Sequence, residues 1–435
     1  MKIRILFTAV LLAITTLSVY PSGNLAELTK AAISADPEIS GPAIKALREL
    51  GQQGSDALFE TYAKEIYEAG DYRTPANWVR IANALDKVTM QKDSYASLRI
   101  FWHTDIEEAK KVSRKTNRPI LSLRLLGNLN EELSCANSRL FRALLYPENH
   151  SVLHEKYVLH WKTVRPAPKV TIDFGDGRKI IRTLTGNSIH YVLDSDGNVI
   201  DALPGLYSSV EFRRFLNQAK QVFDESRKVS TLETKQYYKR YQELSFQELV
   251  ANRKRNMRLA NIDFAEEVKL KAESPKLKNA IPTAIDAAPS AVTKMAVTAE
   301  NLVVDQITDD FSKFASRLNL RDWKTLAELR VGKVTLRAES KGFIWRQLKD
   351  TGATMAGHSQ RINRLQEYIA LDTVRNEYLY RPAIYEILAN NGKLTADEVN
   401  EIIYDKVFLT PNSDPWLGLN APDIYTAIYA NGIVK

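Results

Sequence analysis

Cys135 is the only cysteine among the 435 residues, and its thiol is the first side chain to consider for covalent chemistry. A thiol reacts as the thiolate, which attacks disulfides and peroxides. A single cysteine permits no internal disulfide. We therefore expect either a reactive or intermolecular thiol or a small buried apolar side chain, and the surroundings of Cys135 decide between them.

The sequence around Cys135 predicts a strand that leads into a helix. The apolar run Ile120–Leu126 is short and lies between a proline and a glycine, which favours a buried strand. Apolar residues recur at helical spacing from Leu140 onward, so Cys135 is expected near the start of a helix. Ser134 is the expected cap, because its hydroxyl can accept a hydrogen bond from an unpaired amide.

Charged groups near this predicted helix start act on the thiol in opposite directions. The unpaired amides and the positive end of the helix dipole favour a thiolate. Arg139 and Arg142 favour it as well, whereas Glu131 and Glu132 oppose it if they lie close. The sequence gives no distances, so the net effect on the pKa of Cys135 stays open.

The histidines offer few alternatives for catalysis or metal binding. His150 and His154 have the spacing of metal ligands on a helix, but no carboxylate or cysteine motif completes a site, and we expect a surface pair. His160 and His190 fall on two predicted strands, and their rings would lie close together if these strands are neighbours in a sheet. Either could serve as a base for Cys135, although a hydrogen-bonded structural role is the commoner outcome.

No other motif indicates a cofactor. The stretch Asp194–Asn198 is similar to part of a calcium loop but lacks the downstream glutamate, so it predicts a hairpin turn. The sequence contains no dinucleotide fingerprint, phosphate loop, nucleophile elbow or zinc-protease motif. We therefore expect neither a metal nor a cofactor.

The sequence resembles the thioredoxin superfamily over about residues 98–225. Cys135-Ala-Asn-Ser138 follows a strand and a loop, and it resembles the monothiol form of the family motif. The stretch Ser188–Ile200 resembles the later hairpin of the family, and Gly205 with Glu211–Leu216 resembles its closing glycine and last helix. The flanks resemble those of exported bacterial proteins that carry such a domain.

This resemblance implies an α/β thioredoxin-like central domain, a mixed sheet flanked by helices. It also implies that Cys135 is the attacking residue and that Ser138 stands at the resolving position, where it can hold a thiolate but cannot resolve a mixed disulfide. The sequence departs from the family in two ways. The usual aromatic residue and proline around the motif are absent, and Ser188 stands where the cis-proline is expected.

Helical segments are predicted on both sides of this domain. Residues 27–96 are expected to form helices that resemble a HEAT-like unit, with Ser40 and Ser55 as caps. Residues 226–298 are expected to form a charged helix and a linker, and residues 299–435 a helical C-terminal domain whose Trp416 docks on the core.

Residues 97–225 contain the remaining predicted elements of the central domain. Thr104 is expected to cap a helix, Tyr157–Val164 to form a strand, and Ser208 to cap the last helix. An added hairpin is expected at Val170–Thr183, and it could cover or shape the face near Cys135.

The first 26 residues have the pattern of an export signal. Lys2 and Arg4 precede the apolar stretch Ile5–Val19, which is short for a membrane span. We expect a periplasmic or secreted protein, with the membrane involved only if the signal stays uncleaved. The formal net charge of +8 is mild for this length, so no nucleic-acid partner is expected.

Two functional hypotheses follow. In the first, the chain is a thiol-disulfide oxidoreductase or isomerase-like protein of the cell envelope, which uses Cys135 on an envelope protein substrate and an external low-molecular-weight thiol for resolution. In the second, the thioredoxin-like domain is a non-catalytic scaffold that binds another envelope protein. A sulfur sealed beneath apolar side chains would favour the second hypothesis.

Overall fold

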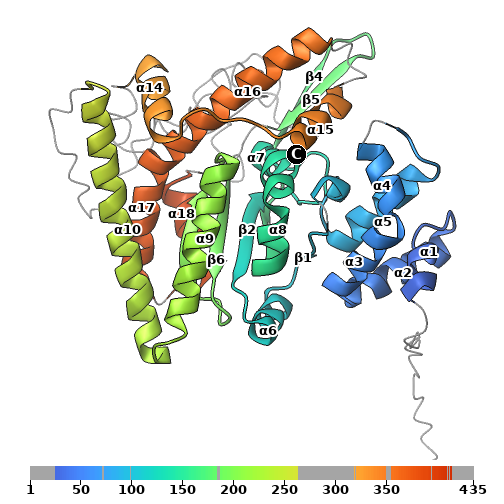
Figure 1. Ribbon diagram of the computed structural model, residues 1–435, viewed down its shortest axis with the longest axis horizontal. Coiled ribbons are helices and arrows are strands. Elements are labelled where there is room, and N and C mark those ends of the chain that lie inside the picture. Colours follow the sequence, from blue (N-terminus) through green and yellow to red (C-terminus); the bar gives the residue numbers. More distant parts are fainter. Residues whose placement is uncertain are drawn as a thin grey trace, which may run out of the picture.

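The computed structural model describes residues 25–70, 73–97, 99–183, 187–262, 318, 320–348, 354–392, 394–408, 410 and 412–413. The predicted signal, the linker expected up to residue 298 and the segment with Trp416 lie outside these residues. Figure 1 shows a helical N-terminal part, a central sheet and a group of C-terminal helices packed on that sheet.

The N-terminal part consists of five helices around their own apolar core. The helices are α1 (Leu25–Ala31), α2 (Pro37–Glu49), α3 (Gln52–Thr61), α4 (Ala63–Gly70) and α5 (Trp78–Thr89). The backbones of α2 and α3 cross closely at Gly54, where an added Cβ would lie 1.9 Å from the carbonyl oxygen of Leu47. The helical prediction for this part is confirmed.

The predicted caps of these helices were wrong. The cap of α2 is Asp36, whose carboxylate accepts a hydrogen bond from the amide of Glu38 at 2.9 Å. Ser40 lies inside the helix, because Asp36 is itself a favourable cap and Pro37 fits the first turn. Ser55 is buried within α3, which begins directly after Gly51.

The central sheet has five strands in the order β1-β3-β2-β6-β7. They are β1 (Trp102–His103), β2 (Ile120–Leu126), β3 (Val158–Arg165), β6 (Ser188–Leu193) and β7 (Val199–Pro204). The first three in this order run parallel, β6 runs antiparallel to β2, and β7 runs antiparallel to β6. Every residue of β2 is buried, as a strand at the centre of a covered sheet requires.

Helices from the central region pack on this sheet. They are α6 (Ile106–Thr116), α7 (Ala136–Leu140), the π-helical turn η2 (Phe141–Leu145), α8 (Tyr146–Lys156) and α9 (Ser209–Ser226). Ser208 caps α9 as predicted, accepting a hydrogen bond from the amide of Glu211. Asp105, not Thr104, caps α6, because its carboxylate bonds the amide of Glu107 at 2.8 Å. A 3-10 turn, η1 (Ser94–Ser97), joins this region to the N-terminal helices.

The connection from β3 to β6 is a hairpin, as predicted. Its strands β4 (Lys169–Asp173) and β5 (Lys179–Thr183) form a two-stranded sheet of their own. No helix is described within this connection, so it supplies none to cover one face of the sheet. That face of the sheet must therefore be covered from elsewhere.

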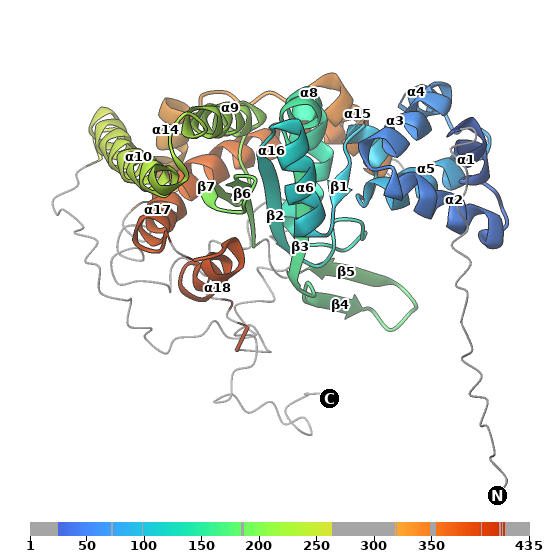
Figure 2. The same cartoon turned by 90° about the horizontal axis from the view of Figure 1, so that it is seen from below.

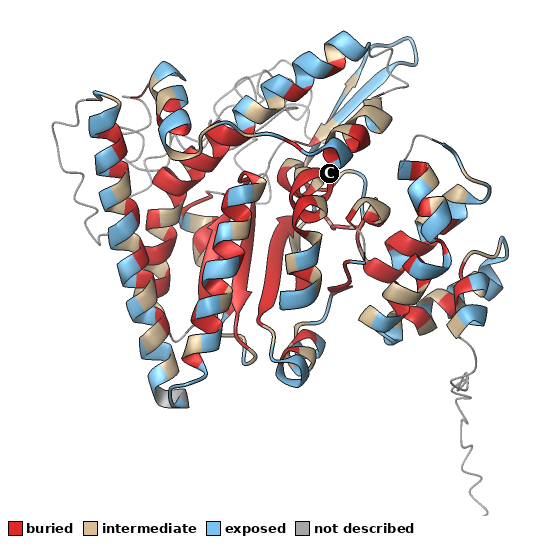
Figure 3. Ribbon diagram, viewed as in Figure 1, coloured by how far each residue is buried: buried red, intermediate tan, exposed pale blue. Residues whose placement is uncertain are grey.

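The described C-terminal residues are helical and belong to the same apolar core as the sheet. The elements are α10 (Thr231–Leu259), α14 (Leu320–Arg330), α15 (Ala338–Leu348), α16 (Met355–Arg375), the π-helical turn η4 (Asn376–Tyr380), α17 (Arg381–Asn390) and α18 (Ala396–Lys406). Figure 2 shows α8 and α9 on one side of the sheet and α18 on the other. Figure 3 shows the strands buried between these layers.

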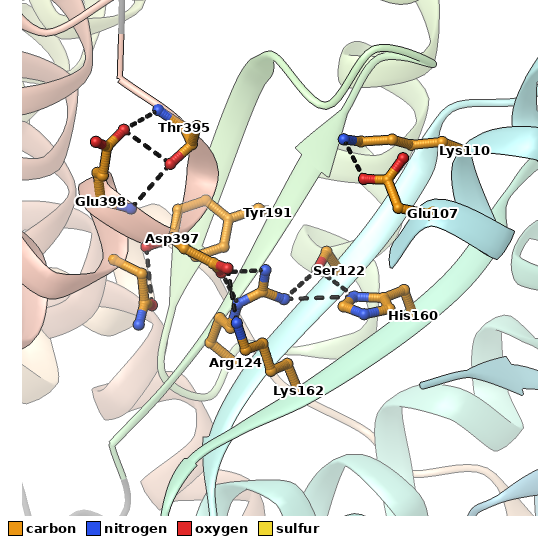
Figure 4. Close-up of polar contacts among 11 residues, drawn as sticks. Glu107, Lys110, Ser122, Arg124, His160, Lys162, Tyr191, Thr395, Asp397 and Glu398 are labelled. Atoms are coloured by element: carbon orange, nitrogen blue, oxygen red, sulfur yellow. Dashed lines mark hydrogen bonds and ion pairs between the residues drawn. The ribbon is translucent and has the colours of Figure 1, made fainter. Parts of the chain in front are cut away.

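Helix α18 covers the face that the hairpin connection leaves open. Asp397 bonds Arg124 of β2 at 2.8 Å and Lys162 of β3 at 2.7 Å (Figure 4). On the next strand, the Tyr191 hydroxyl donates to the side-chain oxygen of Asn400 at 3.1 Å. The ion pairs and this hydrogen bond fix α18 across β3, β2 and β6.

A buried ion pair joins the other C-terminal helices to the edge of the sheet. The carboxylate of Asp201 on β7 accepts hydrogen bonds from the hydroxyl of Tyr241 on α10 at 2.6 Å and from Arg381 on α17 at 3.3 Å. Nearby, Arg330 of α14 bonds both Glu211 of α9 and Glu377 of η4. Buried charges are tolerated when paired in this way, so these helices are held to α9 and β7 in one arrangement.

We expect Asp397→Asn to lower the free energy of unfolding by about 1–3 kcal/mol, because Arg124 is buried and loses its charged partner. Urea unfolding monitored by circular dichroism measures this. Asp405→Asn on the same helix is the matched control and should change the free energy by less than about 0.5 kcal/mol. Equal effects of the two changes would contradict the role assigned to Asp397.

Candidate functional site around Cys135

Cys135 lies at the junction of β2 and α7, as the sequence predicts. Its backbone amide donates a hydrogen bond to the carbonyl of Leu126, the last residue of β2, at 3.0 Å. Cys135 is itself the N-cap residue of α7. Ser134 does not cap the helix, and this prediction was wrong. Its hydroxyl is instead buried, 2.9 Å from the hydroxyl of Ser138.

The thiol of Cys135 is fully buried. The residue has 0% of its surface exposed and belongs to the apolar core of the sheet. The Sγ atom lies 3.3 Å from the Ser138 hydroxyl, to which it donates a hydrogen bond. The structure thus brings Cys135 and Ser138 together, but it presents neither of them to solvent, because Ser138 is also buried.

Burial raises the pKa of the Cys135 thiol above its ordinary value. The hydrogen bonds of the sulfur with Ser138 and with the backbone, and the charge of Arg139, act in the opposite direction but do not compensate for the loss of water around the thiolate. Helix α7 continues without a break through η2 into α8, so the dipole of this helix also favours the thiolate, but it does not offset the burial. The protonated thiol is therefore the favoured form at neutral pH.

The two arginines near Cys135 bind the loop that precedes it. Arg139 donates to the carbonyl of Ser134 and to the hydroxyl of Thr183, 3.0 Å away at the base of the hairpin. Arg142 is buried and donates to the carbonyls of Leu129 and Glu131 at 2.9 and 2.7 Å. The hairpin thus reaches the Cys135 region through Thr183, and the arginines hold the covering loop in place.

His160 and His190 are not neighbours in the sheet, and this expectation was wrong. Strand β2 lies between β3 and β6, where His160 pairs with Ser122 and His190 pairs with Leu123. Successive residues of a strand face opposite sides, so the two rings lie on opposite faces. Strand order depends on the crossover connections, which the sequence pattern of each strand does not reveal.

Neither of these histidines is hydrogen-bonded to Cys135. The Nδ1 of His160 lies 2.8 Å from the hydroxyl of Ser122, and the Nε2 of His190 lies 2.9 Å from that of Tyr146. Burial lowers the pKa of both rings to about 3, so both are neutral at pH 7. Both rings are therefore neutral hydrogen-bonding groups within the buried core.

The remaining histidines of the predicted surface pair also have ordinary partners. His150 lies 3.0 Å from the carbonyl of Pro147, and His154 lies 3.5 Å from the carboxylate of Asp56. Across the residues that the structure describes, no group of three or more histidine, cysteine or carboxylate side chains could hold a metal ion. Among the helices described there, none is long and apolar enough to cross a membrane.

Ser188 begins β6 at the end of the sheet where Cys135 lies. It pairs with Leu125, one residue before the carbonyl that binds the Cys135 amide. The peptide bonds of the described residues are all trans. The Ser188 hydroxyl is buried, and it finds no hydrogen-bond partner among the described residues.

Sequence reasoning missed the buried polar cluster on the opposite face of the sheet. Figure 4 shows Ser122, Arg124 and His160 in one hydrogen-bonded group that continues to Asp397. The available signal was an arginine inside an apolar strand, because a buried charge must have a partner. The partner, 273 positions away, could not be named from the sequence.

Comparisons with known proteins give no relative for this chain. No family model, no curated protein and no solved structure matches it.

We expect the stability of the protein to decrease as the pH falls from 7 to 5. The folded pKa of His190 is about 3, below the unfolded value of about 6.5, so the unfolded state takes up a proton that the folded state does not. Stability from this ring is complete above about pH 6.5 and is lost toward pH 3, with about 2 kcal/mol lost by pH 5.

His190→Gln therefore should cost about 2 kcal/mol less at pH 5 than at pH 7, measured by urea unfolding at both values. Leu121→Ala, a buried change without a titrating group, should cost the same at both. An equal cost of His190→Gln at the two pH values would show that the ring is protonated or accessible in the folded protein.

Proposed function

We propose that this chain is a non-catalytic scaffold with a thioredoxin-like central domain, exported to the cell envelope, where it binds another protein. The observation that carries this proposal is the fully buried thiol of Cys135 with its raised pKa. A nucleophilic cysteine must be deprotonated and accessible, and burial opposes both conditions. Cys135 then acts as a small apolar residue that seals the junction of β2 and α7.

The thioredoxin-like assignment rests on the order and direction of the strands. Three parallel strands in the order β1-β3-β2, with β6 antiparallel to β2 and β7 antiparallel to β6, form the mixed sheet flanked by helices that the resemblance implies. The position of Cys135 after the central strand also agrees with it. Export is proposed from the basic start and apolar stretch within the first 26 residues.

Monothiol disulfide exchange is the second candidate, favoured by one observation. Cys135 stands at the amino end of α7, beside Arg139, whose charge lowers the pKa of the thiol. This chemistry would require the loop before Cys135 to open, because the sulfur has no exposed surface. The two arginines that bind that loop oppose such opening.

Alkylation of the native protein by iodoacetamide at pH 8 distinguishes the two candidates. We expect Cys135 to react at least about 100-fold more slowly than in the urea-unfolded chain, because only an accessible thiolate is attacked. Cys135→Ser gives the background, and its hydroxyl can keep the contact with Ser138. A native rate equal to or above that of a free thiol would overturn the scaffold proposal in favour of thiol chemistry.

A disulfide-exchange assay provides the matching functional readout. The wild-type protein and Cys135→Ser should reduce or exchange a soluble disulfide substrate at the same background rate in the presence of glutathione. A rate that depends on Cys135 would support the second candidate.

A further inference from the structure

The hairpin of β4 and β5 has two free edges. In the described part of the chain these strands pair only with each other, and the main sheet does not include them. Figure 2 shows the hairpin extending away from the central sheet and its helices. An isolated two-stranded sheet is marginal in water, and free strand edges pair readily with another strand. The hairpin is therefore a surface on which an added strand would be stabilising.

Both faces of the hairpin expose apolar side chains beside basic ones. Phe174, Ile180 and Ile181 have 52%, 37% and 41% of their surface exposed. Along β5, one face carries Ile180 between Arg178 and Arg182, and the other carries Ile181 next to Lys179. A strand added beside β5 would thus meet apolar residues at the centre and cations around them.

The acidic residues of the hairpin are already paired within it. Asp173 bonds Lys179 at 2.8 Å, and Asp176 bonds Arg178 at 2.7 Å. The four basic residues of 169–183 exceed the two acidic ones, so the hairpin keeps a positive charge after these pairs are counted. This charge favours an acidic partner.

The backbone ladder shows which groups of β5 face outward. The amide of Phe174 bonds the carbonyl of Arg178, so this closing pair is hydrogen-bonded. Such pairs alternate with open pairs in an antiparallel ladder, which makes Thr171 and Ile181 an open pair whose amides and carbonyls face outward. The guanidinium of Arg182 bonds the carbonyl of Ile181 at 2.8 Å, as expected for a carbonyl outside the ladder.

We propose that the outer edge of β5 binds an extended segment of another protein, in which two apolar residues are flanked by acidic residues. The apolar pair would lie beside Ile180 and Ile181, and an acidic residue beside Arg182, because Arg178 and Lys179 already bond Asp176 and Asp173. This inference rests on the proposed scaffold function and names the class of partner.

The charge of the hairpin favours an acidic strand over a second copy of this chain and over an anionic membrane. A second copy that paired β5 against β5 would bring its own arginines and lysine close together, and like charges across strands repel. An anionic membrane would meet Asp173 and Asp176 near the turn of the hairpin, beside the exposed Phe174. An acidic residue beside Arg182 lies toward the base of the hairpin, away from both of these carboxylates.

Fluorescence anisotropy with the full chain tests the proposal. The probe is a fluorescein-labelled peptide, Thr-Glu-Val-Val-Glu-Glu, and the same peptide with lysine in place of glutamate is the control. We expect saturable binding of the acidic peptide and at least tenfold weaker binding of the basic one. Equal binding of both, or binding of neither, would overturn the proposal.

Proline substitutions separate the two edges. Ile181→Pro removes the outward amide of β5 without removing a ladder hydrogen bond, and it should weaken binding of the acidic peptide at least tenfold. Thr171→Pro makes the same change on the outer edge of β4 and should leave binding within twofold. Loss of binding in both variants, or in neither, would contradict an edge-specific site.

Charge reversal provides a test that does not depend on a proline. Arg182→Glu should weaken binding at least tenfold, whereas Lys169→Glu on β4 should weaken it less than threefold. Equal losses would indicate a general charge effect and overturn the proposal. Two further results would overturn the proposal. One is dimerisation of the full chain that is abolished by Ile181→Pro, and the other is tighter binding to phosphatidylglycerol vesicles than to the peptide.

These results remain distinguishable from the test of the scaffold function. If the peptide fails to bind while Cys135 stays unreactive, the hairpin proposal fails and the scaffold function stands. If Cys135 reacts rapidly while the peptide binds at β5, the scaffold function fails and the edge site stands.

Discussion

The constraint on which the rest of the structure depends is that β2 must be covered on both faces. All seven of its residues are buried, including the charged Arg124. Helices α8 and α9 lie on one side of the sheet, and α18 covers part of the other. The ion pair of Arg124 with Asp397 meets two needs at once, because it fixes the covering helix and gives the buried cation a partner. The C-terminal helices are therefore part of the core of the central domain.

The same need for burial decides the chemistry of Cys135. A helix terminus stabilises a negative charge by about 0.3–1 kcal/mol, and Cys135 stands at the terminus of the helix that runs through α7, η2 and α8. Removing a charge from water costs several kcal/mol even after relaxation of the protein. Burial therefore outweighs the helix terminus and Arg139, and the pKa of the thiol rises. The neighbouring groups alone would favour a thiolate at this position. Because the preceding loop buries the sulfur, Cys135 instead contributes to packing as a neutral thiol.

The sequence predicted the elements whose signals are local. The apolar run of β2, the glycine-rich turn of the hairpin and the Ser208 cap of α9 each depend on neighbouring residues, and each prediction is confirmed. The caps of α2 and α6 were misplaced because an aspartate near the predicted residue makes the cap instead. The positions of His160 and His190 were wrong because strand order follows from long connections. The burial of Cys135 and the partner of Arg124 depend on contacts with distant segments, which residue patterns do not encode.

The separation of 273 positions between Arg124 and Asp397 also bears on how the chain reaches its folded state. During synthesis β2 is made long before α18. One face of the nascent sheet therefore stays exposed to water until Asp397 has been made. Contacts between such distant positions slow folding, because a large loop must close before they give any stabilisation. Under the export proposed above, this delay would leave time for the unfolded polypeptide to pass through a narrow pore.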